Sequence, residues 1–185
     1  MKTILISDLH GQEKTLLYLK KIIDREKPQA LICSGDITSF GETGFLDRFF
    51  KILEDSRLQG FLIWGNSDSE EIQERMRKSQ YNSHLVSRNL EGERVFGVSL
   101  TEEPIKINGA DIKGAILITH GPPLKAMIDR KYENAPRYHI SGHLHRLRWV
   151  KKYPSTIHIQ VPTLQGGEYA TLSFAPFEVE FCSIL

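Results

Sequence analysis

The stretch Thr3-Ile4-Leu5-Ile6-Ser7-Asp8-Leu9-His10 is an apolar run that ends in an aspartate and a histidine two positions apart. The same order, an apolar run followed by polar residues able to bind a metal ion, recurs after Ala30–Ser34, Phe61–Trp64, Ala115–Ile118 and Tyr138–Ser141. If these runs are strands of one sheet, every polar cluster leaves it at the carboxyl edge. In open α/β sheets, that edge is where ligands bind.

The clusters supply seven potential metal ligands: Asp8, His10, Asp36, Asn66, His120, His143 and His145. Asp8 and His10 would share one face of a continuing strand, because side chains alternate along a strand. Asp36 has two carboxylate oxygens and could bridge two ions. Each residue alone is a weak signal, but the repetition after five apolar runs indicates one shared site.

The ligand types define the chemistry that we expect. A mixture of oxygen and nitrogen ligands suits Mn, Fe, Co, Ni or Zn better than Mg or Ca alone. The clusters contain no cysteine, which argues against a closed structural zinc site. Two divalent ions ~3.5–4 Å apart are an arrangement that hydrolyses phosphoesters.

Between the apolar runs, helical spacing predicts helices over Thr15–Glu26, Thr43–Glu54, Ser69–Lys78 and Leu124–Lys131. This alternation of strands and helices favours parallel strands. Further along, Asn108-Gly109 predicts a hairpin, and the chain after His145 is typical of antiparallel β structure. We therefore expect two sheets packed face to face, with helices on their outer faces, in one domain over residues 1–185.

The composition narrows the possible partners and compartment. The 185 residues carry a formal net charge of +1, so no basic excess indicates a nucleic-acid partner. Cys33 and Cys182 are the only cysteines, and we predict buried, reduced thiols for both. No apolar stretch approaches the ~20 residues that a membrane helix needs. The N-terminus enters a strand at once, so we expect no signal peptide, no membrane partner and a cytoplasmic location.

The motifs Asp8-x-His10, Gly35-Asp36, Gly65-Asn66, His120 and Gly142-His143-x-His145 together resemble those of the calcineurin-like metallophosphoesterase superfamily. The short chain is similar to its small, cap-less bacterial and archaeal phosphodiesterases. The resemblance implies an α/β fold, a four-layered α/β/β/α sandwich of two mixed sheets flanked by helices. It also implies the ligand sets: one metal on Asp8, His10 and His145, the other on Asn66, His120 and His143, and Asp36 bridging the two.

One position departs from that pattern. Many members have a histidine after Gly-Asn, which is assigned to leaving-group protonation or transition-state stabilisation, whereas this chain has Ser67. A serine hydroxyl is a poor general acid, so Ser67 favours substrates with good leaving groups or a proton supplied by water. For Asp68 two interpretations stay open, the orientation of a metal ligand or water and the N-cap of the following helix.

Other candidates have simpler interpretations. We expect His84 to be solvated within the polar stretch 79–87, and His139 to pack within its strand. His158 is expected on a solvent or inter-strand face. Arg146 could touch a substrate phosphate, but a surface arginine is the simpler interpretation.

These observations lead to a dinuclear metal-dependent phosphoesterase acting on small-molecule phosphoesters, with diesters favoured over monoesters. Attack by a metal-bridging hydroxide is the implied mechanism, with catalytic roles for Asp36, Asn66 and His120. Manganese is the expected metal, with Ni, Co, Fe or Zn as alternatives. The competing hypothesis is a catalytically weak or inactive scaffold with the same fold that binds partner proteins. The sequence leaves the oligomeric state open.

Overall fold

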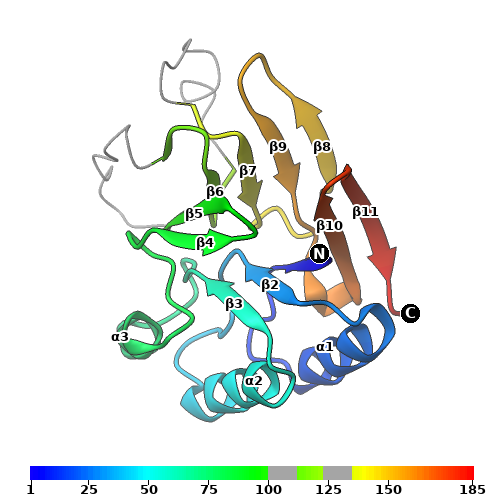
Figure 1. The fold of residues 1–185 in the computed structure, drawn as a ribbon. Coiled ribbons are helices and arrows are strands. Elements are labelled where there is room, and N and C mark those ends of the chain that lie inside the picture. Colours follow the sequence, from blue (N-terminus) through cyan, green and yellow to red (C-terminus); the bar gives the residue numbers. More distant parts are fainter. Residues whose placement is uncertain (100–111, 123–134) are drawn as a thin grey trace.

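The computed structural model describes residues 1–99, 112–122 and 135–185, and Figure 1 shows how their helices and strands are arranged. The described helices are α1 (Glu13–Glu26), α2 (Thr43–Asp55), α3 (Glu70–Lys78) and the short 3-10 helix η1 (Leu164–Gly166). The described strands are β1 (Thr3–Ile6), β2 (Ala30–Cys33), β3 (Gln59–Leu62), β4 (Arg88–Leu90), β5 (Glu93–Val98), β6 (Ile116–Thr119), β7 (Tyr138–Ser141), β8 (Trp149–Lys152), β9 (Ile157–Gln160), β10 (Glu168–Phe174) and β11 (Phe177–Ser183). The expected hairpin at Asn108-Gly109 and the expected helix over Leu124–Lys131 lie outside the described residues.

The first sheet has the strand order β11-β10-β1-β2-β3. Strands β1, β2 and β3 are parallel, and α1 and α2 connect them, as the strand–helix order predicts. Strand β10 joins β1 antiparallel, and β11 forms the outer strand beside it. The sheet is therefore mixed, with its parallel half built from the N-terminal third of the chain.

The second sheet has the order β4-β5-β6-β7-β9-β8. Its four central strands, β5, β6, β7 and β9, are parallel, and β4 and β8 are antiparallel strands at its two edges. The tail after His145 therefore departs from the expected all-antiparallel arrangement. Strands β8 and β9 do pair antiparallel, as do β10 and β11, but β9 also runs parallel to β7 and the two hairpins join different sheets.

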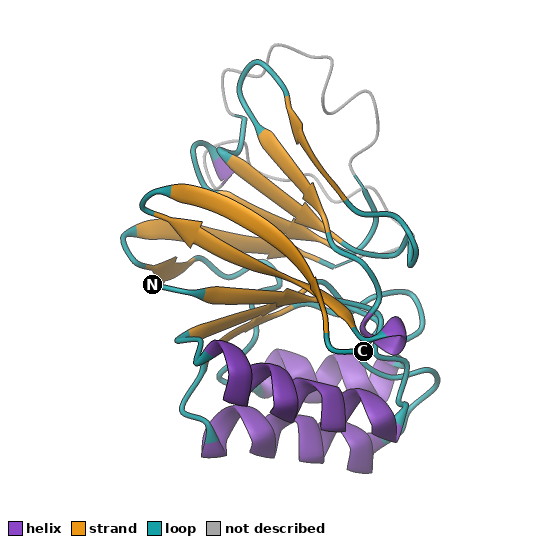
Figure 2. Ribbon diagram, turned by 90° about the vertical axis from the view of Figure 1, so that its right-hand side faces the viewer, coloured by secondary structure: helices purple, strands orange, loops and turns teal. Residues whose placement is uncertain are grey.

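The layers follow from the alternation of side chains along each strand. In β1, Ile4 and Ile6 belong to the apolar core between the first sheet and the helices, whereas Leu5 belongs to the core between the two sheets. Figure 2 shows the helices covering one face of the stacked strands. The protein is thus an α/β fold with two mixed sheets packed face to face.

The structure corrects one expectation about the five apolar runs. They are not strands of one sheet: three contribute to β1, β2 and β3 of the first sheet, and two to β6 and β7 of the second. The carboxyl ends of all five strands nevertheless approach one another. The loop after β7 in the second sheet reaches the loop after β1 in the first, because the His143 N–H donates to Asp8 Oδ2.

The remaining expectations on the fold concern the cysteines and membranes. Both cysteines are free thiols, as predicted; Cys33 is also buried as predicted, whereas the expected burial of Cys182 is wrong, because that side chain is partly exposed. None of the described helices is long and apolar enough to cross a membrane.

Candidate functional site

Hydrogen bonds between backbone groups hold together the loops that carry the predicted ligands. The Asp8 N–H donates to the Gly35 carbonyl at 3.0 Å, which joins the loops after β1 and β2. The Gly142 N–H donates to the His120 carbonyl at 2.9 Å, which joins the loops after β6 and β7. Across the sheets, the His143 N–H donates to Asp8 Oδ2 at 3.1 Å. All seven predicted side chains lie in these loops or the adjoining one after β3.

Three of them form a first group, Asp8, His10 and His145. Asp8 Oδ1 lies 3.4 Å from Nε2 of His145 and 3.9 Å from Nε2 of His10. The two imidazole nitrogens are 3.4 Å apart. One carboxylate oxygen and two imidazole nitrogens therefore converge on one point, as the resemblance implies.

The second group is Asp36, His120 and His143. Its centre is His120 Nε2, which lies 3.3 Å from Asp36 Oδ2 and 3.1 Å from Nδ1 of His143. The amide oxygen of Asn66 lies 3.0 Å from the same His120 nitrogen. Asn66 therefore places a fourth atom that could bind a metal beside this group.

Asp36 lies between the two groups. Its Oδ2 atom is 3.6 Å from His10 Nε2 in the first group and 3.3 Å from His120 Nε2 in the second. One carboxylate thus faces histidines of both groups, which is the geometry that a bridging ligand requires.

The unpaired atoms of the site fit divalent metal ions. Asp8 Oδ1 is buried and has no hydrogen-bond partner among the described residues, although a buried polar atom left unpaired is costly. In its neutral form, the His120 ring donates from Nδ1 to the Ser34 carbonyl at 2.8 Å and presents the Nε2 lone pair to the Asn66 oxygen. A bound cation would satisfy these facing lone pairs, and a carbonyl that fixes the histidine tautomer is the usual support of a metal ligand.

Charge at the centre of the site is set by Asp36 and His120. Burial by itself would raise the pKa of the Asp36 carboxyl, but His120 and hydrogen bonds from Ser67 outweigh it and lower the pKa to about 2. Burial likewise opposes protonation of His120, yet the Asp36 carboxylate raises the pKa of the imidazole above its ordinary value. Asp36 is therefore ionised at neutral pH, the state in which a carboxylate binds a cation.

The backbone of the site is strained at most of the ligands. Asp8, His10, Asp36, His143 and His145 all have positive φ, between 36° and 67°. This left-handed region is uncommon for residues with a side chain, and such outliers gather at functional sites. The hydrogen bonds between loops hold these ligands in that conformation.

Asp68 supports the site in a way that neither interpretation from the sequence foresaw. Its buried carboxylate accepts hydrogen bonds from the Gly65 N–H at 2.9 Å and from the Thr38 N–H and hydroxyl at 2.7 and 2.9 Å. Asp68 thus ties the loop that carries Asn66 to the loop that carries Asp36. The N-cap interpretation is wrong, because the side chain of Ser69 caps α3.

Ser67 binds Asp36 directly. Its backbone N–H donates to Oδ1 at 2.8 Å and its hydroxyl donates to Oδ2 at 3.0 Å. The residue that replaces the common histidine therefore orients the carboxylate between the two groups. The sequence marked this position as a departure but carried no signal of the contact.

Thr163 and Ser39 are further supporting residues that the sequence did not indicate. The Thr163 hydroxyl donates to the Asp8 carbonyl at 2.8 Å, and the Thr163 N–H donates to the His145 carbonyl at 2.8 Å. The Ser39 hydroxyl donates to the His10 carbonyl at 3.1 Å. Both support the first group: Ser39 from the loop that also carries Asp36, and Thr163 from the segment between β9 and β10, which contains no ligand motif.

The expectation that His84 is solvated is wrong. Its ring packs against Trp64 with centroids 4.1 Å apart, and its Nδ1 accepts a hydrogen bond from the Ser99 N–H at 3.0 Å. Burial and the nearby Arg77 lower the pKa of His84 to about 4. His84 therefore packs against Trp64 and lies outside the ligand groups.

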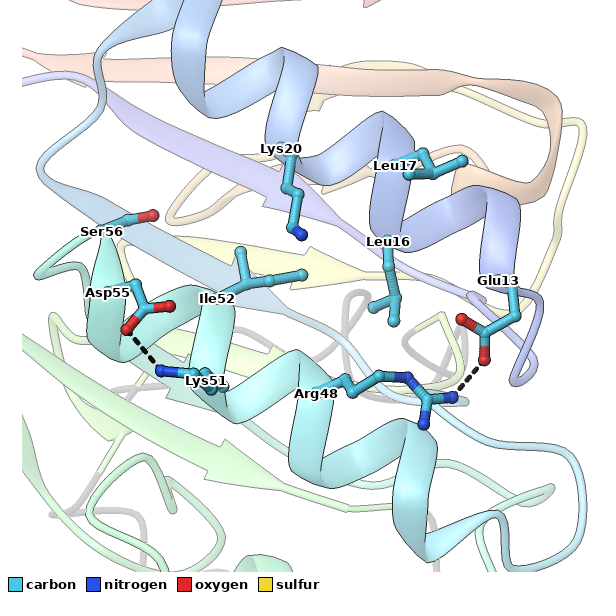
Figure 3. Close-up of a pocket in the computed structure, with 9 residues that line it drawn as sticks. All are labelled: Glu13, Leu16, Leu17, Lys20, Arg48, Lys51, Ile52, Asp55 and Ser56. Atoms are coloured by element: carbon cyan, nitrogen blue, oxygen red, sulfur yellow. Dashed lines mark hydrogen bonds and ion pairs between the residues drawn. The ribbon is translucent and has the colours of Figure 1, made fainter.

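A surface groove between α1 and α2, shown in Figure 3, is separate from this site. Its cavity of about 350 Å³ is lined by α1 and α2 residues such as Leu16, Leu17 and Ile52. The Lys51–Asp55 ion pair at 2.9 Å lies on its rim. None of the seven predicted ligands lines it, so it gives no support to a functional role.

Imidazole and carboxylate ligands gathered at the carboxyl ends of parallel strands are typical of a metal-dependent hydrolase. The family profile described as calcineurin-like phosphoesterase matches residues 1–147, which include every predicted ligand. The chain belongs to this family of metallophosphoesterases.

Solved structures share the fold at low identity. The protein TT1561 of Thermus thermophilus is similar with a TM-score of 0.77 and 15% identity, covering 100% of this chain and 99% of that one. A protein described as a novel archaeal phosphodiesterase has a TM-score of 0.66 and 16% identity, and 100% of each chain is covered. The phosphoesterase YfcE of E. coli has a TM-score of 0.57 and 16% identity, again with 100% of each chain covered. No curated protein sequence matches the chain significantly.

Proposed function

We propose that this chain is a dinuclear metal-dependent phosphoesterase that prefers phosphodiesters. The observation that carries the proposal is the position of Asp36 Oδ2, within 3.6 Å of His10 Nε2 and 3.3 Å of His120 Nε2. A single carboxylate between two groups of ligands is suited to two ions that share it.

The residues divide between the two ions as follows. Asp8, His10 and His145 would hold one ion, Asn66, His120 and His143 would hold the other, and Asp36 would serve both. Two divalent ions, when bound, polarise the phosphoryl oxygens and lower the pKa of a water between them. Manganese is our proposed metal, because the mixture of carboxylate, amide and imidazole ligands suits it, and Ni, Co, Fe and Zn share this suitability.

The proposed ligands differ in exposure, so the site is buried on one side and open to solvent on the other. Asp8, Asp36 and His120 are buried, whereas Asn66 and His143 are exposed. A phosphoester would approach from the exposed side, where the Asn66 amide also offers N–H donors for a phosphoryl oxygen. The buried carboxylates below carry the negative charge that holds the cations in place.

The preference for diesters is supported by Ser67 and by one structural relative. The Ser67 hydroxyl donates to Asp36 Oδ2 at 3.0 Å, so its proton is already engaged there. With no general acid at this position, substrates with good leaving groups are favoured. One relative of the same fold is described as an archaeal phosphodiesterase.

Replacing Ser67 by histidine tests this explanation. We expect Ser67→His to raise hydrolysis of esters with poor leaving groups, because a positioned acid contributes about 10²–10⁴-fold in rate. The measurement is kcat against leaving-group pKa for a series of aryl methyl phosphates, and its slope should become shallower in the variant. Ser67→Ala is the control: it removes the hydroxyl bond to Asp36 without adding an acid, so its slope should stay as in the unmodified chain. An unchanged slope in Ser67→His would contradict the explanation.

The proposed function is tested by removing and restoring the metal. Chelator-stripped protein should be inactive, and Mn²⁺ should restore hydrolysis of bis-p-nitrophenyl phosphate at a higher rate than that of p-nitrophenyl phosphate. Ni²⁺, Co²⁺, Zn²⁺ and Mg²⁺ are compared in parallel. A higher rate with the monoester would overturn the diester preference. Two bound ions with no turnover on either substrate would favour the scaffold hypothesis.

A further inference from the structure

Two buried histidines lie side by side in the second sheet, outside the ligand groups. His139 of β7 and His158 of β9 are partners in the strand register, and their ring centroids are 5.3 Å apart. They are only 4% and 2% exposed. The neighbouring Ile140 and Ile159 belong to the core between the sheets, so the alternation of side chains directs both histidines to the opposite face. Burial of polar rings on this face needs compensating hydrogen bonds.

His158 is the start of a directed chain of hydrogen bonds. Its Nδ1 accepts from the Trp149 indole N–H at 3.2 Å, which leaves the proton of the neutral ring on Nε2. That Nε2–H donates to the Ser141 hydroxyl at 2.8 Å, and the hydroxyl donates to Gln160 Oε1 at 2.9 Å. The Gln160 amide then donates to the Gly142 carbonyl at 2.5 Å. The Gln160 amide also lies 3.3 Å from the Val161 carbonyl, and the direction of the chain runs from the indole to the loop after β7.

His139 begins a second, shorter chain. Its Nε2 lies 2.8 Å from the Thr119 hydroxyl, and that hydroxyl donates to the Gly121 carbonyl at 2.6 Å. Since the hydroxyl proton is engaged with Gly121, the histidine nitrogen is the donor. Burial lowers the pKa of His139 to about 3 and that of His158 to about 4, so both rings are neutral at pH 7, as the two chains require.

Both chains end on the backbone beside ligands of the second group. Gly121 directly follows His120, and Gly142 directly precedes His143. The Gly142 N–H also donates to the His120 carbonyl at 2.9 Å, so the backbone segments that carry His120 and His143 are joined. The first group is linked to this backbone through the His143 N–H, which donates to Asp8 Oδ2 at 3.1 Å, and it has separate support from the Thr163 hydroxyl, which donates to the Asp8 carbonyl.

We propose that His139 and His158 are positioning residues that fix the backbone of His120 and His143 and thereby strengthen metal binding at the second group. This inference rests on the proposed function, since it requires that the second group binds an ion. The two histidines act through hydrogen-bond chains and contact neither metal nor substrate. Outer-shell partners of a metal ligand affect metal affinity by about 10–100-fold. Because His139 and His158 act through two or more successive hydrogen bonds, we expect an effect at the lower end of this range.

The test measures each ion by itself in the full-length chain. His10→Ala leaves only the second group complete, and His143→Ala leaves only the first. Mn²⁺ affinity is measured in both backgrounds by equilibrium dialysis with metal analysis, with and without His158→Leu. We expect His158→Leu to weaken binding roughly 10-fold in the His10→Ala background and by much less in the His143→Ala background, where the backbone N–H of residue 143 still reaches Asp8.

Two further variants separate positioning from a structural role. His158→Gln keeps an N–H donor that can reach Ser141, so it should restore most of the affinity lost in His158→Leu. Thr163→Val should lower Mn²⁺ affinity at the first group and leave the affinity at the second group unchanged. If His158→Leu lowers the thermal unfolding temperature but leaves both affinities unchanged, or weakens both equally, the positioning role is overturned.

The outcomes also distinguish this inference from the proposed function. An unmodified chain that binds two Mn²⁺ ions, shows the selective effect of His158→Leu and hydrolyses no phosphoester would overturn the function alone. Turnover with two ions and no effect of His158→Leu would overturn the positioning role alone. Failure of the His10→Ala chain to bind Mn²⁺ at its complete second group would overturn both.

Discussion

The Asp36→Asn variant is expected to lose more than about 100-fold of the metal-restored phosphoester hydrolysis while its fold stays intact. Removal of outer-shell partners already costs about 10–100-fold in affinity or activity, and Asp36 is proposed as a direct ligand of both ions. The amide also places an N–H₂ group where a carboxylate oxygen now faces His10 at 3.6 Å and His120 at 3.3 Å. The measurements are kcat/KM for bis-p-nitrophenyl phosphate and the number of Mn²⁺ ions bound per chain.

The control for Asp36→Asn is the same exchange at the surface. Asp24 has a side chain that is 82% exposed, so Asp24→Asn should retain full activity and both ions. Circular dichroism and thermal unfolding of the metal-free proteins show whether the Asp36→Asn chain is folded. A folded Asp36→Asn protein that hydrolyses the diester at the unmodified rate would contradict the two-ion assignment.

The strands, and the position of the site at their carboxyl ends, could be predicted because the sequence patterns that indicate them are local. Apolar runs such as Thr3–Ser7 and Ala30–Ser34 are short and are each followed by polar or glycine residues. The division of the runs between two sheets was not predictable from these signals. It depends on long-range pairing: β1 has β10 as its antiparallel neighbour, with Thr3 opposite Leu172, and β9 of the C-terminal tail lies beside β7.

The identities of the candidate ligands could be read from the sequence, but their conformation could not. Asp8, Asp36 and His143 adopt positive φ, a backbone conformation that the sequence normally marks with glycine. Here hydrogen bonds to distant residues enforce it, for example the bond from the His143 N–H to Asp8 Oδ2. Such bonds exist only once both sheets are in place.

The residues that support the ligands through hydrogen bonds were also not predictable from the sequence. Asp68 accepts from Thr38, thirty residues earlier, and the motif around Asp68 contains no trace of that partner. His84 lies in a polar stretch that favours solvation, yet tertiary packing places it against Trp64. Local composition predicts average exposure, whereas burial of a single polar ring depends on which hydrogen-bond partners the fold supplies.

At Gly142 the loop after β7 lies close to Ser7 and Ser34, which follow β1 and β2 of the first sheet, and Gly142→Ala is expected to damage both stability and activity. A Cβ atom at this position would lie 1.8 Å from the Ser7 hydroxyl oxygen and 2.8 Å from both Ser7 Cβ and the Ser34 hydroxyl oxygen. Ser7 and Ser34 are fully buried, so they have little room to move. Overpacking of this kind costs about 1–3 kcal/mol, which urea unfolding of the metal-free protein measures. The displaced backbone would also carry His143 with it, and a misplacement near 1 Å can cost about 100-fold in rate.

A second substitution tests whether the close approach to Ser7 is the cause. Ser7→Gly removes two of the three nearest atoms, so Gly142→Ala combined with Ser7→Gly should recover most of the stability and of kcat/KM that Gly142→Ala alone loses. Gly166→Ala is the matched control, because its added Cβ would meet only Glu168 Oε2, at 3.9 Å. The double-mutant cycle gives the coupling between residues 7 and 142 directly. Strong coupling would mean that the contact between the two sheets sets the position of His143, whereas additive effects would show that the glycine is needed for another reason.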